Sequence, residues 1–221
     1  MRGAPQIMGE ALVAASLTSR GGGHVLKLRS NQMVFRQGEP ADAVYYIQSG
    51  KIRLGVVSVH GREGVVAIPG PGEFFGEGAL SRHSVRAASA VTMDASTVIR
   101  IARKPMIRLI RQEAVVSDTF MEFLLSRNAQ IEADLIDHLV NSSERRLARV
   151  LLLLADFGKD DTREAVVPKI SQEVLAAKVG TTRSRINFFM NKFRRLGLIE
   201  YDGAQKSLRV RSALLDIIVR D

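Results

Sequence analysis

The chain has no cysteine among its 221 residues. This absence excludes disulfide bonds, iron–sulfur clusters, thiol switches and zinc sites built from thiolates, and it is compatible with a reducing compartment. No apolar run approaches the length of a membrane-spanning helix, and the N-terminus lacks the basic and then apolar order of a secretory signal peptide. We therefore expect a cytoplasmic protein with no membrane partner.

Acidic residues are in short supply, because 23 Asp and Glu stand against 32 Lys and Arg and leave a formal net charge of +9. Residues 141–221 hold 16 of the basic and 10 of the acidic residues, so this last part of the chain carries +6 of the +9. A basic excess concentrated in one segment fits a polyanionic partner, although charge alone does not separate nucleic acid from an acidic membrane.

Catalytic motifs are absent from the sequence as well. It shows no Ser–His–Asp grouping, no metal-ligand spacing and no nucleotide-hydrolysis motif. We expect a binding protein rather than an enzyme, with no catalytic and no metal-binding residues. The histidines repeat no haem-ligand pattern and are expected at the surface or in loops; they are His24, His60, His83 and His138.

Residues 172–197 have the spacing of a helix-turn-helix. Ala176 is small where two helices approach closely, and Gly180 permits the left-handed backbone of a tight turn. Ile186 returns a branched apolar side chain into the angle between the helices. This spacing is typical of a motif whose second helix enters the major groove of DNA. A hydroxyl from Thr181 or Thr182 is expected to cap that helix.

The second helix of this motif has an apolar face and a polar, basic face. A basic surface helix without a DNA partner is the alternative interpretation, but the small–Gly–aliphatic spacing favours DNA binding. Residues at the start of a recognition helix meet base edges, and arginine suits guanine. The predicted DNA contacts are Ser171, Thr182, Arg183, Ser184, Arg185, Asn187, Phe188 and Lys192.

The rest of residues 141–221 completes a winged helix. Residues 141–143 resemble a hinge, and an apolar-rich helix follows over residues 145–157. Residues 198–210 alternate around a turn and predict the hairpin that forms the wing. Lys206 and Arg209 on this hairpin either reach DNA phosphates or serve only solubility.

Residues 24–103 show short apolar or alternating runs separated by Gly, Pro and Asp, which predicts an antiparallel jelly roll. A short helix over residues 105–112 and a long helix from about residue 116 follow. Apolar residues recur along the long helix near a heptad spacing, which indicates a dimer seam or a helix that packs on its own domain. The seam is preferred, because helix-turn-helix proteins read two-fold sites; it comprises Phe120, Leu124, Ile131, Leu135 and Leu139.

The predicted fold class is therefore α+β, in three parts. Residues 1–114 form an effector-sensing β-roll domain, residues 115–140 a long dimerisation helix, and residues 141–221 a winged helix-turn-helix domain. The expected macromolecular partners are double-stranded DNA with a palindromic operator and a second copy of the chain.

A glycine–glutamate stretch in the β-rich part forms a candidate anion site. After a short strand, Gly76, Glu77 and Gly78 can open a turn whose backbone N–H groups point outward. Arg86 can supply a bidentate partner for a phosphate, and Glu77 an acceptor for sugar hydroxyls. The alternative is a tight turn with a surface ion pair between Glu77 and Arg86.

This stretch reads G-E-x-A-L from Gly76 and R-A-A-S from Arg86, and it is similar to the phosphate-binding cassette of cyclic-nucleotide-binding domains. From about residue 32 onward, the chain resembles the cyclic-AMP receptor protein / FNR family of bacterial transcription regulators. The resemblance implies a sensor, a dimerisation helix and a DNA-binding domain in that order, with RNA polymerase as a further partner. It implies cyclic AMP or cyclic GMP as the effector and no obligatory cofactor.

Carried over by resemblance, Glu77 binds the ribose hydroxyl, Arg86 binds the cyclic phosphate, and the backbone of residues 76–79 and of Ala87 lines the pocket. Five positions in three places depart from the family pattern. Ala87 replaces a serine; Ile131 and Glu132 replace the hydroxyl residues that hold adenine; and Ser184 and Phe188 replace a glutamate and an arginine of the recognition helix. The second interpretation is therefore an effector-independent regulator with a degenerate pocket.

Overall fold

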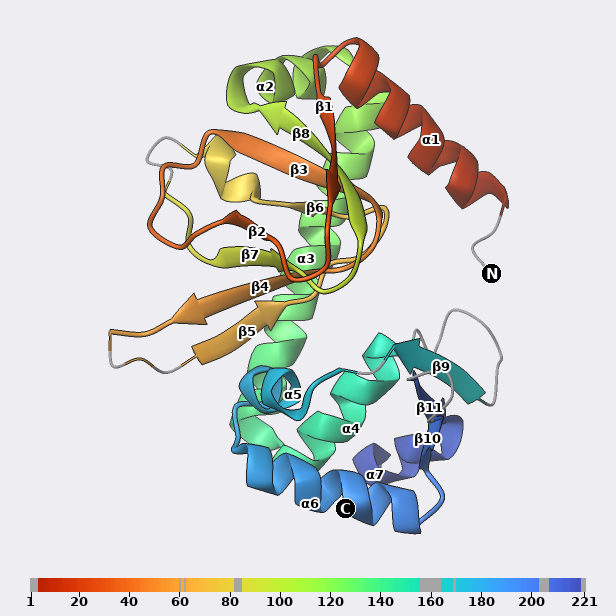
Figure 1. Ribbon diagram of the computed structural model, residues 1–221. Helices are drawn as coiled ribbons and strands as arrows, with labels where there is room; N and C mark the ends of the chain where they lie inside the picture. Colours follow the sequence, from red (N-terminus) through yellow and green to blue (C-terminus); the bar gives the residue numbers. More distant parts are fainter. Residues whose placement is uncertain are drawn as a thin grey trace. The chain divides into compact units, whose positions relative to one another are not determined.

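The computed structural model describes residues 4–59, 61, 63–81, 85–155, 164–168, 170–202 and 207–219, and their helices and strands are shown in Figure 1. The chain divides into two compact units, Met1–Gln130 and Ile131–Asp221. Within the described ranges, no helix combines the length and the apolar character that crossing a lipid bilayer requires.

The first unit is built on two antiparallel sheets of four strands each. One has the order β1 (His24–Leu28), β8 (Ser96–Ala102), β3 (Ala43–Ser49) and β6 (Phe74–Phe75). The other has the order β2 (Met33–Phe35), β7 (Ser89–Thr92), β4 (Ile52–Val57) and β5 (Glu63–Ala67). The predicted jelly roll is confirmed.

Strand β3 shows why this part of the sequence forms a two-layer core. Its first five residues are all buried, and successive side chains of a strand point to opposite faces. Val44 and Tyr46 pack into one apolar cluster with Phe74, whereas Tyr45 and Ile47 pack into the other cluster. The strand is therefore covered on both sides, which explains its unbroken apolar run.

Three helices cover one face of this sandwich: α1 (Ala4–Ser19), α2 (Arg103–Gln112) and the first part of α3 (Ala114–Val140). Each places apolar side chains in the same cluster, namely Val13 and Leu17, Met106 and Leu109, and Val116 and Phe120. Helix α1 precedes the first strand and spans 16 residues. A single-turn helix, η1 (Glu77–Leu80), follows β6.

The second unit contains α4 (Ser143–Leu154), α5 (Gln172–Val179), α6 (Arg183–Arg195), η2 (Ser212–Leu214) and α7 (Leu215–Val219). Its sheet has the order β10 (Ile199–Asp202), β11 (Ser207–Arg211) and β9 (Glu164–Pro168). The β10–β11 hairpin is the predicted wing, and its tip with Lys206 lies outside the described residues. Strand β9 was not predicted; it pairs with β11 and adds the third strand.

The turn between α5 and α6 has the predicted geometry. Gly180 takes a left-handed conformation, with φ 70° and ψ 45°, which side chains with a Cβ disfavour. An added Cβ there would lie 3.1 Å from Nε2 of His138. Ala176 and Ile186 are buried, with Ile186 fully enclosed. The hydroxyl oxygen of Thr182 accepts a hydrogen bond from the backbone N–H of Arg185 at 3.3 Å and thereby caps α6.

Candidate effector pocket and DNA-binding surface

The turn after β6 is the first part of the candidate effector site. Gly76 is left-handed, with φ 74° and ψ 20°, and precedes η1. A Cβ at this position would lie 2.7 Å from Nη1 of Arg86, so only glycine lets the arginine approach the backbone so closely. Ala79 is fully buried, whereas Gly78 is exposed and Glu77 is half-buried. The turn is therefore anchored by Ala79 while its glycines and Glu77 remain accessible.

Arg86 is a buried cation beneath this turn, with only 4% of its surface exposed. Its Nη2 donates a hydrogen bond to the backbone oxygen of Ala43 at 2.9 Å, and its Nη1 donates one to the oxygen of Gly76 at 3.2 Å. The guanidinium carbon lies 4.1 Å from the ring centroid of Phe35. Among the described residues, its buried Nε has no hydrogen-bond partner. An unsatisfied buried donor is costly.

Burial lowers the pKa of Arg86 below its ordinary value, and Tyr45 and Asp42 oppose that shift. An arginine remains charged even so. A carboxylate oxygen of Asp42 lies 3.5 Å from Nη2, but the Asp42 side chain is 65% exposed and also pairs with Arg100. The cation is therefore incompletely neutralised. A bound anion would compensate for the hydration that the guanidinium loses on burial and would provide a hydrogen-bond acceptor for Nε.

The alternative of a surface ion pair between Glu77 and Arg86 is wrong. Arg86 is not a surface residue, and the ion pair that it makes is with Asp42. The sequence had no signal for Asp42 or for the carbonyl oxygen of Ala43, because neither belongs to the glycine–glutamate stretch or to the R-A-A-S motif. Ala87, the residue after the arginine, is exposed.

The two residues at the adenine-holding positions lie on α3 and not in the β-roll. Ile131 and Glu132 are exposed on α3 and belong to the second unit, whereas the glycine turn and Arg86 belong to the first. Their side chains offer an apolar surface and a carboxylate. Neither can donate the hydroxyl hydrogen bonds that the family resemblance implies for adenine recognition.

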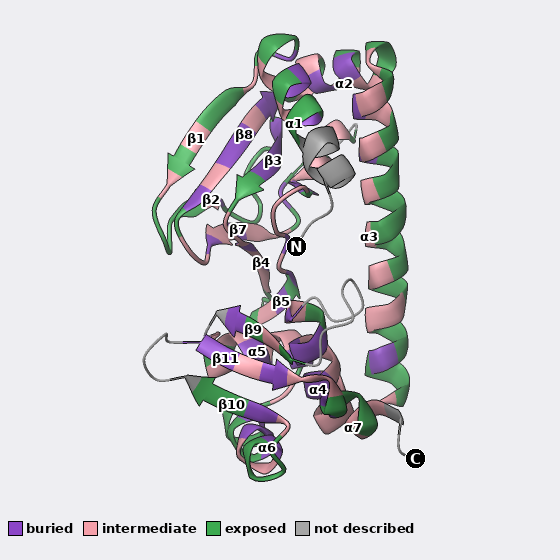
Figure 2. Cartoon of the chain, turned by 90° about the vertical axis from the view of Figure 1, so that its right-hand side faces the viewer, coloured by how far each residue is buried: buried purple, intermediate pink, exposed green. Residues whose placement is uncertain are grey.

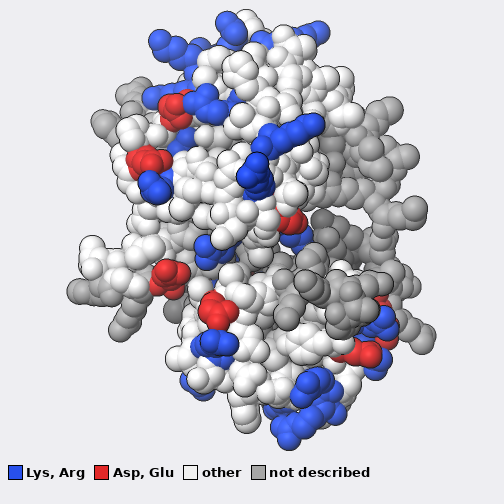
Figure 3. Space-filling model, viewed as in Figure 1, with Lys and Arg blue, Asp and Glu red and all other residues white. Residues whose placement is uncertain are grey.

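Helix α6 presents the candidate DNA-binding surface. Its start is exposed at Arg183, Ser184, Arg185, Asn187 and Phe188, and Lys and Arg side chains gather over α6 in Figure 3. The opposite face is buried in the core of the unit through Ile186, Phe189, Met190 and Phe193. The polar and apolar faces that the sequence indicated are therefore both present.

Several predicted contacts on this surface already hold a protein partner. Nε of Arg183 lies 3.0 Å from a carboxylate oxygen of Glu173, and Nζ of Lys192 lies 2.7 Å from one of Glu144. The amide oxygen of Asn187 accepts hydrogen bonds from Gln172 at 3.3 Å and from Asn191 at 3.2 Å.

Glu173 is held as a carboxylate. A hydrogen bond from its own backbone N–H lowers its pKa, and Ser171 and Arg183 add to that shift, while slight burial opposes it. The hydroxyl oxygen of Ser171 also caps α5 through the N–H of Val174 at 3.2 Å. The Ser171 hydroxyl therefore donates its hydrogen to the Glu173 carboxylate while its oxygen caps α5.

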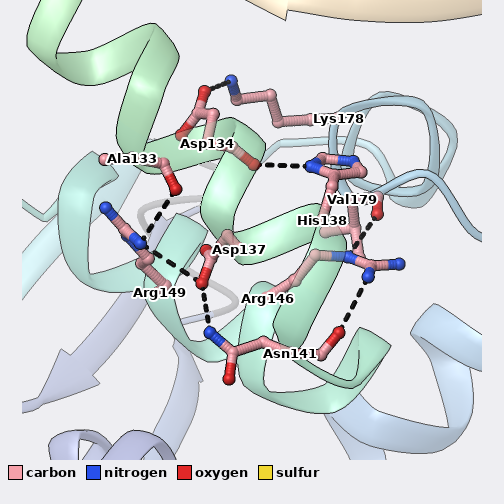
Figure 4. A network of polar contacts seen from close by, with 9 residues as sticks. All are labelled: Ala133, Asp134, Asp137, His138, Asn141, Arg146, Arg149, Lys178 and Val179. Atoms are coloured by element: carbon pink, nitrogen blue, oxygen red, sulfur yellow. Dashed lines mark hydrogen bonds and ion pairs between the residues drawn. The ribbon is translucent and has the colours of Figure 1, made fainter.

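Polar contacts bind the last turns of α3 to the helix-turn-helix, as Figure 4 shows. Nζ of Lys178 on α5 lies 2.7 Å from Asp134, and Nη1 of Arg149 on α4 lies 3.2 Å from buried Asp137. Arg146 donates to the backbone oxygens of Asn141 at 2.9 Å and of Val179 at 3.0 Å. The link at residues 141–143, which the sequence indicated as a hinge, is thus held by polar contacts on both sides in this structure.

The apolar side of α3 is largely exposed along its length (Figure 2). Four of the five predicted seam residues are exposed, at 37% for Leu124, 50% for Ile131, 58% for Leu135 and 76% for Leu139. Phe120 is only 6% exposed and makes a T-shaped contact with Phe74, with the ring centroids 5.2 Å apart. It belongs to the core of the first unit, so it has too little free surface to contribute to a seam.

Comparisons with known proteins agree with this architecture. Residues 25–113 match the cyclic nucleotide-binding domain family, and residues 145–217 match the Crp-like helix-turn-helix domain family. The CRP-like cAMP-activated global transcriptional regulator of Mycobacterium tuberculosis is 30% identical over 172 residues, which are 77% of each chain. The cyclic AMP receptor protein of Thermus thermophilus is 30% identical over 84% of this chain and 83% of its own.

A solved structure shows the same fold. FixK2 from Bradyrhizobium japonicum superposes with a TM-score of 0.75 at 17% identity, over 90% of this chain and 98% of its own. A jelly roll of the cyclic nucleotide-binding type, joined by a long helix to a winged helix-turn-helix, defines a DNA-binding transcriptional regulator. The chain belongs to the Crp/Fnr family of these regulators.

Proposed function

We propose that this regulator is a homodimer whose binding to palindromic DNA is controlled by a cyclic nucleotide held at Gly76, Glu77 and Arg86. The observation that supports this most is Arg86, a buried and incompletely neutralised guanidinium with an unsatisfied Nε beneath a left-handed glycine turn. Cyclic AMP is the first candidate, because the two relatives above are named for it.

In this proposal each part of the cassette has a role in binding. Arg86 pairs with the cyclic phosphate, and Glu77 accepts hydrogen bonds from the ribose hydroxyl. The backbone of Gly76, Gly78, Ala79 and Ala87 contacts the nucleotide. An effector that binds one arrangement of the dimer more tightly shifts the population toward that arrangement.

The output of the proposed switch is DNA binding by two copies of α6. Residues 115–140 serve as the dimerisation helix between a sensor of residues 1–114 and a DNA-binding domain of residues 141–221. Two recognition helices about 34 Å apart would enter successive major grooves on one face of the duplex. The cell compartment is the cytoplasm, and RNA polymerase is the further partner.

The DNA-reading part of the proposal is tested by Arg183→Ala. Arg183 lies at the start of α6 with its side chain 70% exposed, where a bidentate contact with guanine is worth about 1–3 kcal/mol of discrimination. We expect the variant to select the wild-type site from random duplexes, but with a weaker base preference at one position in each half-site. Its binding to the wild-type site should be about tenfold weaker. Equal weakening on every sequence would contradict a base-reading role.

A second candidate function is an effector-independent regulator with the same DNA-binding domain. Two observations favour it: Ile131 and Glu132 lack the hydroxyls for adenine, and Arg86 is already bonded to Ala43 and Gly76. This candidate predicts full DNA affinity without any nucleotide, which the proposed function does not.

A further inference from the structure

Phe188 is an exposed aromatic side chain on the polar face of α6. It keeps 60% of its surface accessible, and its ring makes a T-shaped contact with that of Phe189, with the centroids 5.6 Å apart and the planes at 70°. The neighbouring exposed residues Arg183, Ser184, Arg185 and Asn187 are all polar or charged. The core of the second unit therefore does not explain a phenyl ring at this position.

Helix geometry places Phe188 at the centre of the exposed face. Residues four, seven and eleven positions apart share one side of an α-helix, so Phe188 lies in line with Ser184, Asn191 and Arg195. The buried stripe of Ile186, Met190 and Phe193 lies on the opposite side. If α6 enters the major groove with its core side turned away, Phe188 is directed at the base edges and not at the phosphates.

The chemistry of the ring limits what it can recognise there. A phenyl group neither donates nor accepts the hydrogen bonds that distinguish most base edges. The apolar group that base pairs present in the major groove is the C5-methyl of thymine. We infer that Phe188 selects thymine at one position of each half-site through this methyl group. The inference rests on the proposed DNA-binding function and adds a base identity to it.

The test removes the methyl group and leaves everything else in place. Full-length protein with saturating cyclic AMP first selects duplexes from a random pool. In the selected duplex, each pair of thymines related by the two-fold symmetry of the site is then replaced in turn by deoxyuridine. We expect one pair at which wild-type binding weakens about fourfold for each methyl lost. For Phe188→Ala we expect the ratio of the affinity for the thymine duplex to that for the deoxyuridine duplex to be close to one.

The matched control is Leu196→Ala, because Leu196 is also apolar and 56% exposed but is the C-cap residue that follows α6. It should keep the wild-type ratio. If Phe188→Ala binds too weakly to measure, Phe188→Leu takes its place and should show a smaller ratio than wild type. The inference fails if the loss of no thymine methyl weakens wild-type binding. It also fails if Phe188→Ala and Phe188→Leu both keep the wild-type affinity ratio.

The two failures can be told apart. If wild type and Leu196→Ala select no duplex at all, the proposed DNA-binding function fails and the thymine contact fails with it. If both bind a defined duplex but no deoxyuridine substitution weakens them, only the role of Phe188 is wrong.

Discussion

Arg86→Gln is expected to lower the affinity for cyclic AMP at least about 100-fold, because two charge-assisted hydrogen bonds to a phosphate would be lost. Glutamine keeps a neutral hydrogen-bond donor near Ala43 and Gly76. It removes the buried positive charge, since Arg86 is only 4% exposed. Calorimetric titration of the folded variant measures the effect, with thermal unfolding as the check on its structure.

Arg100→Gln is the control for this variant. Arg100 also pairs with Asp42, but its side chain is 32% exposed and it lies outside the glycine turn. We expect its affinity for cyclic AMP to stay within a few-fold of wild type, as for other partly exposed charges. Equal losses in Arg86→Gln and Arg100→Gln would mean that general positive charge, and not the cassette, attracts the nucleotide.

The double variant Leu135→Asp with Leu139→Asp is expected to be monomeric and to bind its operator at least about 100-fold more weakly. Burying two carboxylates in an apolar seam is strongly unfavourable, and a monomer loses the avidity of two linked half-sites. The two leucines are 58% and 76% exposed, so a folded monomer has room for the substitutions. Sedimentation and operator titration measure the two effects.

The chain offers a closely matched control in Ile136→Asp with Val140→Asp. These residues have the same spacing and exposures of 59% and 76%, but they are turned by about 100° around the helix. The control should remain a dimer. If it dissociates and the Leu135 and Leu139 variant does not, the seam lies on the neighbouring face of α3.

Features whose signal is local could be predicted from the sequence. The helix-turn-helix depends on Ala176, Gly180 and Ile186, which are close in the chain and each have a specific steric role, and all three occupy the expected places. The wing and the jelly-roll strands were also visible, because turn residues separate their alternating runs. The recognition helix has the expected two faces for the same reason.

Features that depend on distant partners could not be predicted. Phe120 fits the heptad pattern of a seam, but the T-shaped contact with Phe74 places it in a core. Strand β9 is short, ends at Pro168 and becomes a strand only because it pairs with β11. The sequence also gave no indication that Asp137 and Arg149 would brace the link after α3.

The most direct test of the central claim is the operator affinity of wild type measured across a titration of cyclic AMP, with cyclic GMP in parallel. We predict an increase of about tenfold or more with one nucleotide, within the usual range of allosteric coupling, and no increase in Arg86→Gln. Tight operator binding that is unchanged at every concentration of both nucleotides would contradict control by a cyclic nucleotide and would favour the effector-independent regulator.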